Sequence, residues 1–156
     1  MTSDARRPSL KGRALRYLAA REHSRAELQA KLARHVGEDD APDAVARVLE
    51  ELQAKGFIDE ARVAESLLHR RAGRLGQARV LHELRAKGLP DGILADAAQQ
   101  LRATELTRAR EVWRKKFGCL PTDAAERSRQ ARFLAARGFG ADVVRRVLGG
   151  VPGDDG

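Results

Sequence analysis

Apolar residues return at helical spacing in three stretches of the chain, residues 28–34, 80–86 and 130–136. In each stretch an apolar or long amphipathic side chain is followed by another four residues later, with charged residues between them. This spacing places the apolar side chains on one face of a helix. It therefore predicts three amphipathic helices that start about 50 residues apart along the chain.

Each of these helices has a further helical pattern on both sides. The patterns that follow lie at residues 45–52, 93–101 and 143–148, and those that precede lie at 15–18, 63–68 and 106–117. Such self-similarity at a fixed period is typical of repeat proteins. The sequence predicts a three-helix unit that occurs three times.

Residues at the expected helix ends agree with this division. Ser24 followed by Glu27 forms a capping box for a helix start. The second and third copies end alike, at Lys87-Gly88-Leu89 and Arg137-Gly138-Phe139, where glycine suits a left-handed residue and the next apolar side chain packs back. The first copy departs from this pattern with His35-Val36-Gly37.

These patterns predict an all-α fold of three tandem three-helix repeats, similar to helix-turn-helix units. A unit of this length buries little surface alone, so neighbouring repeats are expected to stabilise one another in an elongated array, straight or curved. We expect a monomer for the same reason. The expected divisions are flexible ends at 1–9 and 150–156 and repeats at 10–57, 58–102 and 103–149.

Composition excludes several classes of protein. Aromatic residues are 4% of the chain and strand patterns are nearly absent. Cys119 is the only cysteine, so no intrachain disulfide can form, which fits a reducing cytosol. The first ten residues lack an apolar export signal, and no run of 18 apolar residues predicts a membrane span. We expect a cytoplasmic protein.

No arrangement of residues predicts catalysis, a metal site or a cofactor. The four histidines are scattered, and no two are four residues apart beside a carboxylate. The Gly138-Phe139-Gly140 stretch lacks the third glycine and the preceding strand of a dinucleotide site. Cys119 follows an expected helix end, away from the helix start that would activate a thiol. We expect a binding protein that is not an enzyme.

A net charge of +8 favours nucleic acid, acidic protein or an anionic surface as a partner, although a high content of arginine on solvated faces also explains it. One group of cations surrounds a predicted helix start, where the backbone N–H groups of Gly76 and Gln77 could add to an anion site. A second group surrounds Trp113, which with Phe117 fits core packing better than base stacking. The candidate contact residues are Arg70, Arg71, Arg74, Arg79, Arg114, Lys115, Arg145 and Arg146.

Two motifs resemble those of a known family. Residues 56–64, Gly-Phe-Ile-Asp-Glu-Ala-Arg-Val-Ala, resemble the signature of the RecX family of recombination regulators. Residues 76–89 are similar to its second motif, in which a glycine is followed by an apolar residue, Glu-Leu and Lys-Gly. The resemblance extends over about residues 10–149. One departure is Val63, where the family often has an aromatic residue.

The resemblance implies a protein that binds the RecA recombinase filament on single-stranded DNA. It also implies inhibition of the recombinase, ATPase and coprotease activities of that filament, and a part in DNA repair, recombination and control of the SOS response. Direct contact with single- or double-stranded DNA is left open. Gly56, Phe57 and Ile58 are expected to fix the join between units, while Asp59 caps the next helix and pairs with Arg62. The structural signature residues of the two motifs are Gly56, Phe57, Ile58, Asp59, Arg62, Gly76, Leu84, Lys87 and Gly88.

Two other functions are compatible with parts of the same patterns. A helix-turn-helix DNA-binding regulator also has two helices joined by a tight glycine turn, but such regulators usually dimerise on paired half-sites, and this chain repeats its unit internally. An RNA-binding helical array needs base-reading side chains at matched repeat positions, and none are evident. The DNA-binding regulator stays as the alternative.

Overall fold

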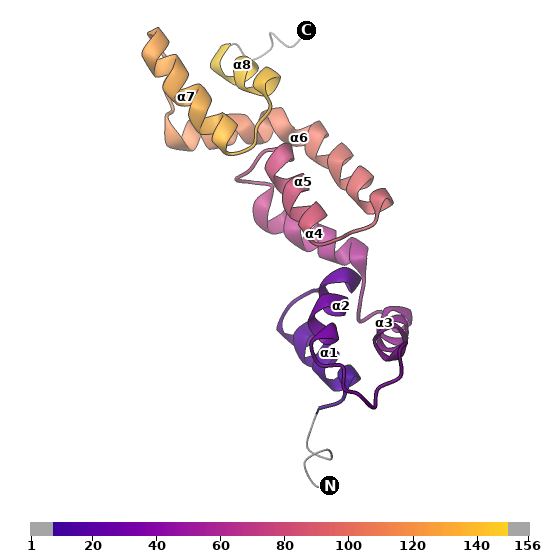
Figure 1. Ribbon diagram of the computed structural model, residues 1–156. Coiled ribbons are helices and arrows are strands. Elements are labelled where there is room, and N and C mark those ends of the chain that lie inside the picture. Colours follow the sequence, from indigo (N-terminus) through magenta and orange to yellow (C-terminus); the bar gives the residue numbers. More distant parts are fainter. Residues whose placement is uncertain (1–7, 150–156) are drawn as a thin grey trace. The chain divides into compact units, whose positions relative to one another are not determined.

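The structure, a computed structural model, describes residues 8–149, and these residues form α-helices with no strand (Figure 1). The predicted all-α fold is confirmed. The helices of the described range are α1 (Leu10–Ala20), α2 (Arg25–Ala33), α3 (Ala44–Ala54), α4 (Glu60–Arg71), α5 (Gln77–Ala86), α6 (Asp91–Lys116), α7 (Ala124–Ala136) and α8 (Ala141–Gly149).

Short polar side chains start several of these helices. At α2 the Ser24 hydroxyl accepts a hydrogen bond from the Glu27 amide at 3.1 Å, and the Ser24 amide donates to the Glu27 carboxylate at 3.0 Å. The predicted capping box is therefore confirmed. Ser9 at α1 and Asp123 at α7 accept from the amide three residues later in the same way. Each cap supplies an acceptor to an amide that has no partner inside its helix.

Left-handed glycines end α3 and α7. Gly56 has a φ of 82°, and the following Phe57 amide donates to the Leu52 carbonyl at 2.9 Å. Gly138 has a φ of 94°, and the Phe139 amide donates to the Leu134 carbonyl at 3.2 Å. Glycine adopts this conformation without the steric cost that a Cβ imposes, so it closes the last helical turn with its carbonyls satisfied.

The count of helices differs from the prediction because α6 is continuous. The pattern predicts separate helices at 93–101 and 106–117, whereas the described residues contain one helix of 26 residues there. No glycine or proline interrupts the chain between Ile93 and Lys116, and the residues between are mostly good helix formers. The expected boundary between residues 102 and 103 thus falls inside α6, and residues 8–149 form eight helices where nine were expected.

The chain divides into two compact units. Among the described residues, unit 1 comprises 8–66 and 86–93, and unit 2 comprises 67–85 and 94–149. The division runs through the second expected repeat, so the repeat boundaries at 57/58 and 102/103 stay predictions. The expected flexible ends fall mostly outside the described residues, but Ser9 lies within them and caps α1.

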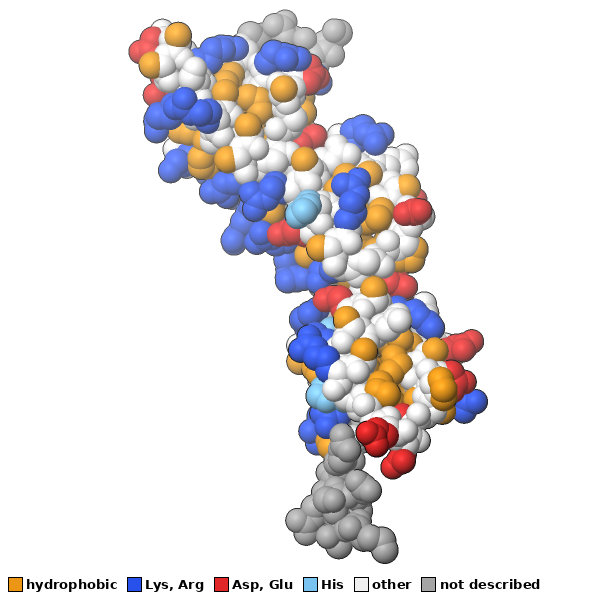
Figure 2. Space-filling model, in the orientation of Figure 1, with side chains coloured by type: hydrophobic (Ala, Val, Ile, Leu, Met, Phe, Trp, Pro, Cys, Tyr) orange, Lys and Arg blue, Asp and Glu red, His pale blue; other side chains and the backbone are white. Residues whose placement is uncertain are grey.

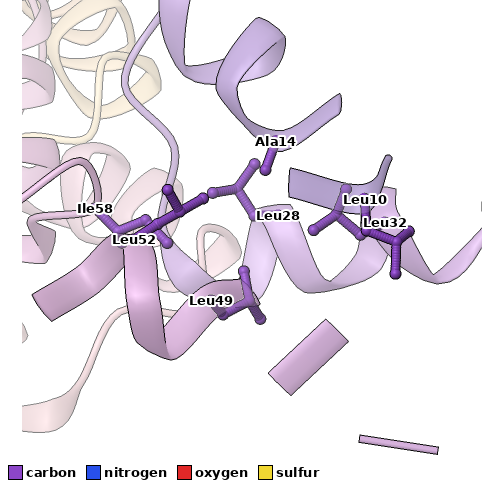
Figure 3. Packing of buried hydrophobic residues seen from close by; sticks show 7 residues of the cluster. All are labelled: Leu10, Ala14, Leu28, Leu32, Leu49, Leu52 and Ile58. Atoms are coloured by element: carbon purple, nitrogen blue, oxygen red, sulfur yellow. The ribbon is translucent and has the colours of Figure 1, made fainter. Parts of the chain in front are cut away.

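The core of unit 1 is formed by α1, α2 and α3 together with Ile58, which follows α3 (Figure 3). Leu28, Leu32 and Leu52 have no exposed surface. Burial of a leucine side chain contributes about 1.5–3 kcal/mol, so these residues hold the three helices together. The buried members are Leu10, Ala14, Leu28, Leu32, Leu49, Leu52 and Ile58.

A second core lies in unit 2, between α6, α7 and α8. Phe139, directly after the left-handed Gly138, is 4% exposed and packs into it, as expected for an apolar residue that follows such a turn. Leu134 has no exposed surface. The buried members are Ala109, Leu134, Phe139, Val144, Val147 and Leu148.

Candidate partner-binding surface

The eight candidate contact residues all lie in unit 2. Among the described residues, unit 2 contains 17 Lys and Arg against 7 Asp and Glu, whereas unit 1 contains 11 against 12. The positive excess of the chain therefore belongs to unit 2. Figure 2 shows Lys and Arg side chains gathered along one edge of that unit. A field of this sign attracts anionic partners to unit 2 and not to unit 1.

The first group of cations combines structural and exposed arginines. Arg71 forms two hydrogen bonds to the Glu83 carboxylate, at 3.2 and 2.9 Å, and so joins α4 to α5. Arg79 donates to the Ala136 carbonyl at 2.8 Å, and so joins α5 to the end of α7. Arg70, Arg74 and Arg79 have exposed side chains. A partner can therefore reach these three members of the group from solvent.

The prediction that the Gly76 and Gln77 amides add to an anion site at the start of α5 is wrong. The Gly76 amide donates to the Arg137 carbonyl at 2.8 Å, and the Gln77 amide donates to the Glu105 carboxylate at 3.2 Å. Both amides are thus occupied by the protein itself. Glu105 lies on α6 and is 7% exposed, so its carboxylate fills the place that an external anion would take.

The second group of cations lies on α6 and α8. Arg114 forms two hydrogen bonds to Glu111, at 3.1 and 2.7 Å, and this bonding lowers the pKa of the Glu111 carboxyl. Lys115 lies 3.8 Å from the same carboxylate, and Arg145 pairs with Asp142 at 3.0 Å. All these pairs are exposed, and exposed pairs contribute little to stability. Their cations can therefore exchange a neighbouring carboxylate for one on a partner.

Trp113 and Phe117 are packed from within. Trp113 lies against the unit 2 core, and its indole N–H donates to the Gln130 side chain at 2.8 Å. Phe117 meets Phe133 edge to face with the ring centroids 5.3 Å apart. The core packing expected for Trp113 is confirmed, and its polar edge is occupied by Gln130, which is 2% exposed.

Cations also lie over this aromatic pair. Lys116 and Arg137 stand over the Phe133 ring, 5.4 and 4.8 Å from its centroid, and Arg129 stands 5.1 Å from the Phe117 centroid. Arg129 and Arg137 are not among the candidate contact residues that the sequence suggests. They come from α7 and its end, and nothing in their local pattern brings them to α6. They extend the cationic surface of unit 2 beyond the two expected groups.

The signature residues 56–62 fasten α3 to the start of α4 within unit 1. Ile58 is 2% exposed and belongs to the unit 1 core, whereas Phe57 is 47% exposed. The Asp59 carboxylate accepts from the Arg62 amide at 3.1 Å, so it caps α4, and its other oxygen lies 3.7 Å from the Arg62 guanidinium. Arg62 also donates to Glu22 at 2.6 Å, which raises the Arg62 pKa, and to the Gly56 carbonyl at 3.1 Å.

One contact recurs in the two units and explains the second motif. In unit 1 the Ser24 hydroxyl, at the start of α2, donates to the Lys87 carbonyl at 2.5 Å, and Lys87 reaches Glu27 at 3.6 Å. A Cβ on the adjacent Gly88 would lie 2.6 Å from that of Ala26. The start of one middle helix thus meets the end of the next repeat's middle helix, at a distance that only glycine permits.

The counterpart in unit 2 joins the start of α5 to the end of α7 through the bond from the Gly76 amide to the Arg137 carbonyl. A Cβ on Gly138 would lie 2.3 Å from the Arg79 side chain.

Within residues 8–149 no group of three or more His, Cys, Asp or Glu side chains is placed to hold a metal ion. None of the helices in this range is both long and apolar enough to cross a membrane.

The fold and its recurring contact define an all-α protein made of consecutive three-helix repeats with a cationic surface. Three family models match it: the first three-helix domain of RecX at residues 11–52, the second at 59–97 and the third at 103–148. The chain belongs to the RecX family.

Relatives support this membership over nearly the whole chain. The regulatory protein RecX of Leptothrix cholodnii is 57% identical over 148 residues, which cover 95% of this chain and 92% of that protein. The regulatory protein RecX of Ralstonia nicotianae is 47% identical over 150 residues, with 95% and 92% covered. The chain is therefore similar to proteins named as regulators.

A solved structure shares the fold. The crystal structure of RecX from Lactobacillus salivarius matches with a TM-score of 0.75 and 18% sequence identity, covering 90% of this chain and 92% of that one. Another, a crystal structure of regulatory protein RecX, matches with a TM-score of 0.71 and 20% identity, covering 88% and 70%. At this identity the likeness concerns the arrangement of the helices.

Proposed function

We propose that this chain binds the RecA recombinase filament on single-stranded DNA and inhibits its recombinase, ATPase and coprotease activities. By doing so it modulates recombination, DNA repair and the SOS response in the cytoplasm, without catalysing a reaction itself. Membership of a family of regulatory proteins supports this function.

The observation that carries the proposal is the concentration of positive charge in unit 2, with 17 Lys and Arg against 7 Asp and Glu. A filament on DNA offers acidic protein surface and phosphates, and both attract such a unit. Complementary charge raises the rate of encounter and fixes the orientation of binding. Cations that contact DNA phosphates release counterions, so binding should weaken as the salt concentration rises.

The contacts of the arginines separate those that join helices from those proposed to contact the filament. Arg71, Arg79 and Arg62 are engaged in joining helices, so their loss would disturb the fold. Arg70 and Arg74 are exposed beside them and are better candidates for contact with the filament. Arg114, Lys115, Arg145 and Arg146 complete the proposed surface from α6 and α8.

Hydrolysis of ATP by RecA on single-stranded DNA tests the function. We expect the chain, added at less than one molecule per RecA protomer, to slow hydrolysis. The double variant Arg70→Glu, Arg74→Glu should inhibit much less. The matched control Arg16→Glu, Arg34→Glu changes the charge equally at exposed positions of unit 1 and should inhibit like the wild type. Unchanged hydrolysis in the presence of the wild-type chain would exclude the proposed function.

The alternative is a helix-turn-helix DNA-binding regulator. It predicts tight, sequence-selective binding to duplex DNA in the absence of RecA. Gel-shift titration with a pool of random duplexes separates the two functions, because an inhibitor of the filament selects no sequence from the pool.

A further inference from the structure

An apolar groove lies in unit 2 beside the second group of cations, and Arg114 belongs to both. It has a volume of about 410 Å³ and is formed by α6, by the segment that follows α6, and by α8. Trp113, Leu120 and Val147 supply its apolar lining, while Arg110, Glu111 and Arg114 provide its charged groups. The groove therefore combines an apolar centre with guanidinium groups at its margin.

Leu120 exposes an apolar side chain in this groove. It is 43% exposed, and in the described part of unit 2 it is the only large apolar residue exposed to this degree. Val147 beneath it is 3% exposed and belongs to the core. An apolar side chain placed against Leu120 would remove surface from water at a site that is already shaped to receive it.

The lining favours an apolar side chain over a nucleic-acid base. Leucine and valine offer no hydrogen-bonding group to the edge of a base, and the indole N–H of Trp113 is already donated to Gln130. A base placed over Leu120 and Val147 would leave the part of its polar edge that faces them without partners, and such desolvation is costly. An aliphatic or aromatic side chain has no such requirement.

The charges favour an acidic neighbour for that side chain. Arg114 is exposed at the margin, and Glu111, the one carboxylate in the groove, is bonded to Arg114 and approached by Lys115. The local balance is therefore positive, in a unit whose described residues already have the excess of cations. Carboxylates on either side of the apolar side chain would meet these guanidinium groups.

We infer that this groove binds a segment of a partner protein in which an apolar side chain is flanked by Asp or Glu. The inference deepens the proposed function and rests on it as far as the RecA filament supplies the segment. The groove gives unit 2 a site that selects shape as well as charge. A cationic surface alone would not distinguish a protein partner from bare DNA.

Co-sedimentation with the RecA filament, by the full chain and matched variants, tests the inference. Leu120→Asp puts a carboxylate at the centre of the groove, and Val36→Asp makes the same change in unit 1 at a residue with 45% exposure. Circular dichroism spectra and melting curves establish that both variants fold. We expect Leu120→Asp to raise the half-saturating concentration at least tenfold and Val36→Asp to change it less than twofold.

A probe peptide tests the same groove without RecA. The peptide has one central Leu between three Glu residues on each side, and its control has Gln in place of Glu. Trp113 is the only tryptophan of the chain, so its emission reports on the groove directly. We expect the acidic peptide to shift this emission, and Leu120→Asp or the Gln peptide to weaken the effect at least fivefold.

The outcomes separate the inference from the proposed function. If the wild-type chain sediments with the filament and Leu120→Asp does so equally well, the inference is overturned while the function stands. If the wild type does not bind the filament, the proposed function fails, and the peptide titration decides the groove alone. Displacement of the peptide by oligo-dT, with loss of oligo-dT binding in Leu120→Asp, would assign the groove to nucleic acid and overturn the inference.

Discussion

Replacement of Gly76 by alanine tests the contact between the start of α5 and the end of α7. A Cβ at this position would lie 2.3 Å from the carbonyl carbon and oxygen of Gly138 and 2.4 Å from the Phe139 amide nitrogen. All three atoms belong to the backbone, so no rotation of a side chain can relieve the overlap. The two segments must move apart, and the bond from the Gly76 amide to the Arg137 carbonyl is then lost.

The cost can be worked from these contacts. Overpacking typically costs about 1–3 kcal/mol, and the lost backbone hydrogen bond adds about 1 kcal/mol. Alanine recovers about 0.4–1 kcal/mol by restricting the unfolded chain. We therefore expect Gly76→Ala to lower the free energy of unfolding by about 1–3.5 kcal/mol and the Tm by about 2–14 °C.

Urea and thermal unfolding followed by circular dichroism at 222 nm measure this loss. Gly92→Ala is the matched control, because no heavy atom lies within 4 Å of a Cβ added at this position. Gly92 lies in the first turn of α6. Gly92→Ala should leave stability unchanged or raise it by up to about 1 kcal/mol. A Gly76→Ala protein within about 0.5 kcal/mol of wild type would refute the close approach of the two backbones.

Three further predictions concern single groups. Ser24→Ala removes the cap of α2 and the bond to the Lys87 carbonyl, and should lower the free energy of unfolding by about 1–3 kcal/mol in the same assay. Hydrogen bonds from Arg129 and then Gln130 lower the pKa of Glu126 to about 2. The ionised Glu126 should therefore stabilise the fold fully above pH 4.5, and this contribution should vanish as the pH falls through about 2. Arg129→Gln should raise the pKa of Glu126 in an NMR titration of its carboxyl carbon. Burial lowers the pKa of His23, so the unfolded chain binds its proton first and stability should fall as the pH drops below about 6.5; the His23→Gln variant should lack this part of the pH dependence.

Local patterns were enough to predict the fold. The spacing of Leu28 and Leu32, the Ser24–Glu27 capping box and the Gly138-Phe139 stop each depend on residues within one helix turn of one another. Since helices satisfy their backbone hydrogen bonds locally, such signals survive folding unchanged. The one merged helix, α6, shows where they end, because an apolar pattern marks faces and does not mark a break that no glycine or proline makes.

The details of the site depend on contacts between distant residues, and the sequence could not predict them. Glu105 caps the start of α5 from a position 28 residues later, and so closes the expected anion site. Arg108 is half-buried and donates to the Ala72 carbonyl at 2.8 Å, and burial lowers its pKa. Both look like solvated helix residues in the sequence. Only the packing of α6 against the turn before α5 distinguishes them from exposed charges.

The groove at Leu120 was missed for a related reason. Its apolar lining joins residues from α6, the following segment and α8, and no local pattern brings these together. A single leucine beside Pro121 in a turn carries no signal of exposure. The exposed fraction of its side chain is a property of the folded unit.

Recognition of the recombinase is separated from recognition of DNA by comparing binding to the RecA filament with binding to DNA alone. Co-sedimentation of the chain is measured at one salt concentration with three partners: the filament on single-stranded DNA, the same DNA without RecA, and a duplex of equal length. If the chain binds the recombinase, half-saturation with the filament should occur at a concentration at least tenfold lower than with either DNA. Equal or tighter binding to bare DNA would contradict it, because the chain would then recognise the phosphate backbone and not the recombinase.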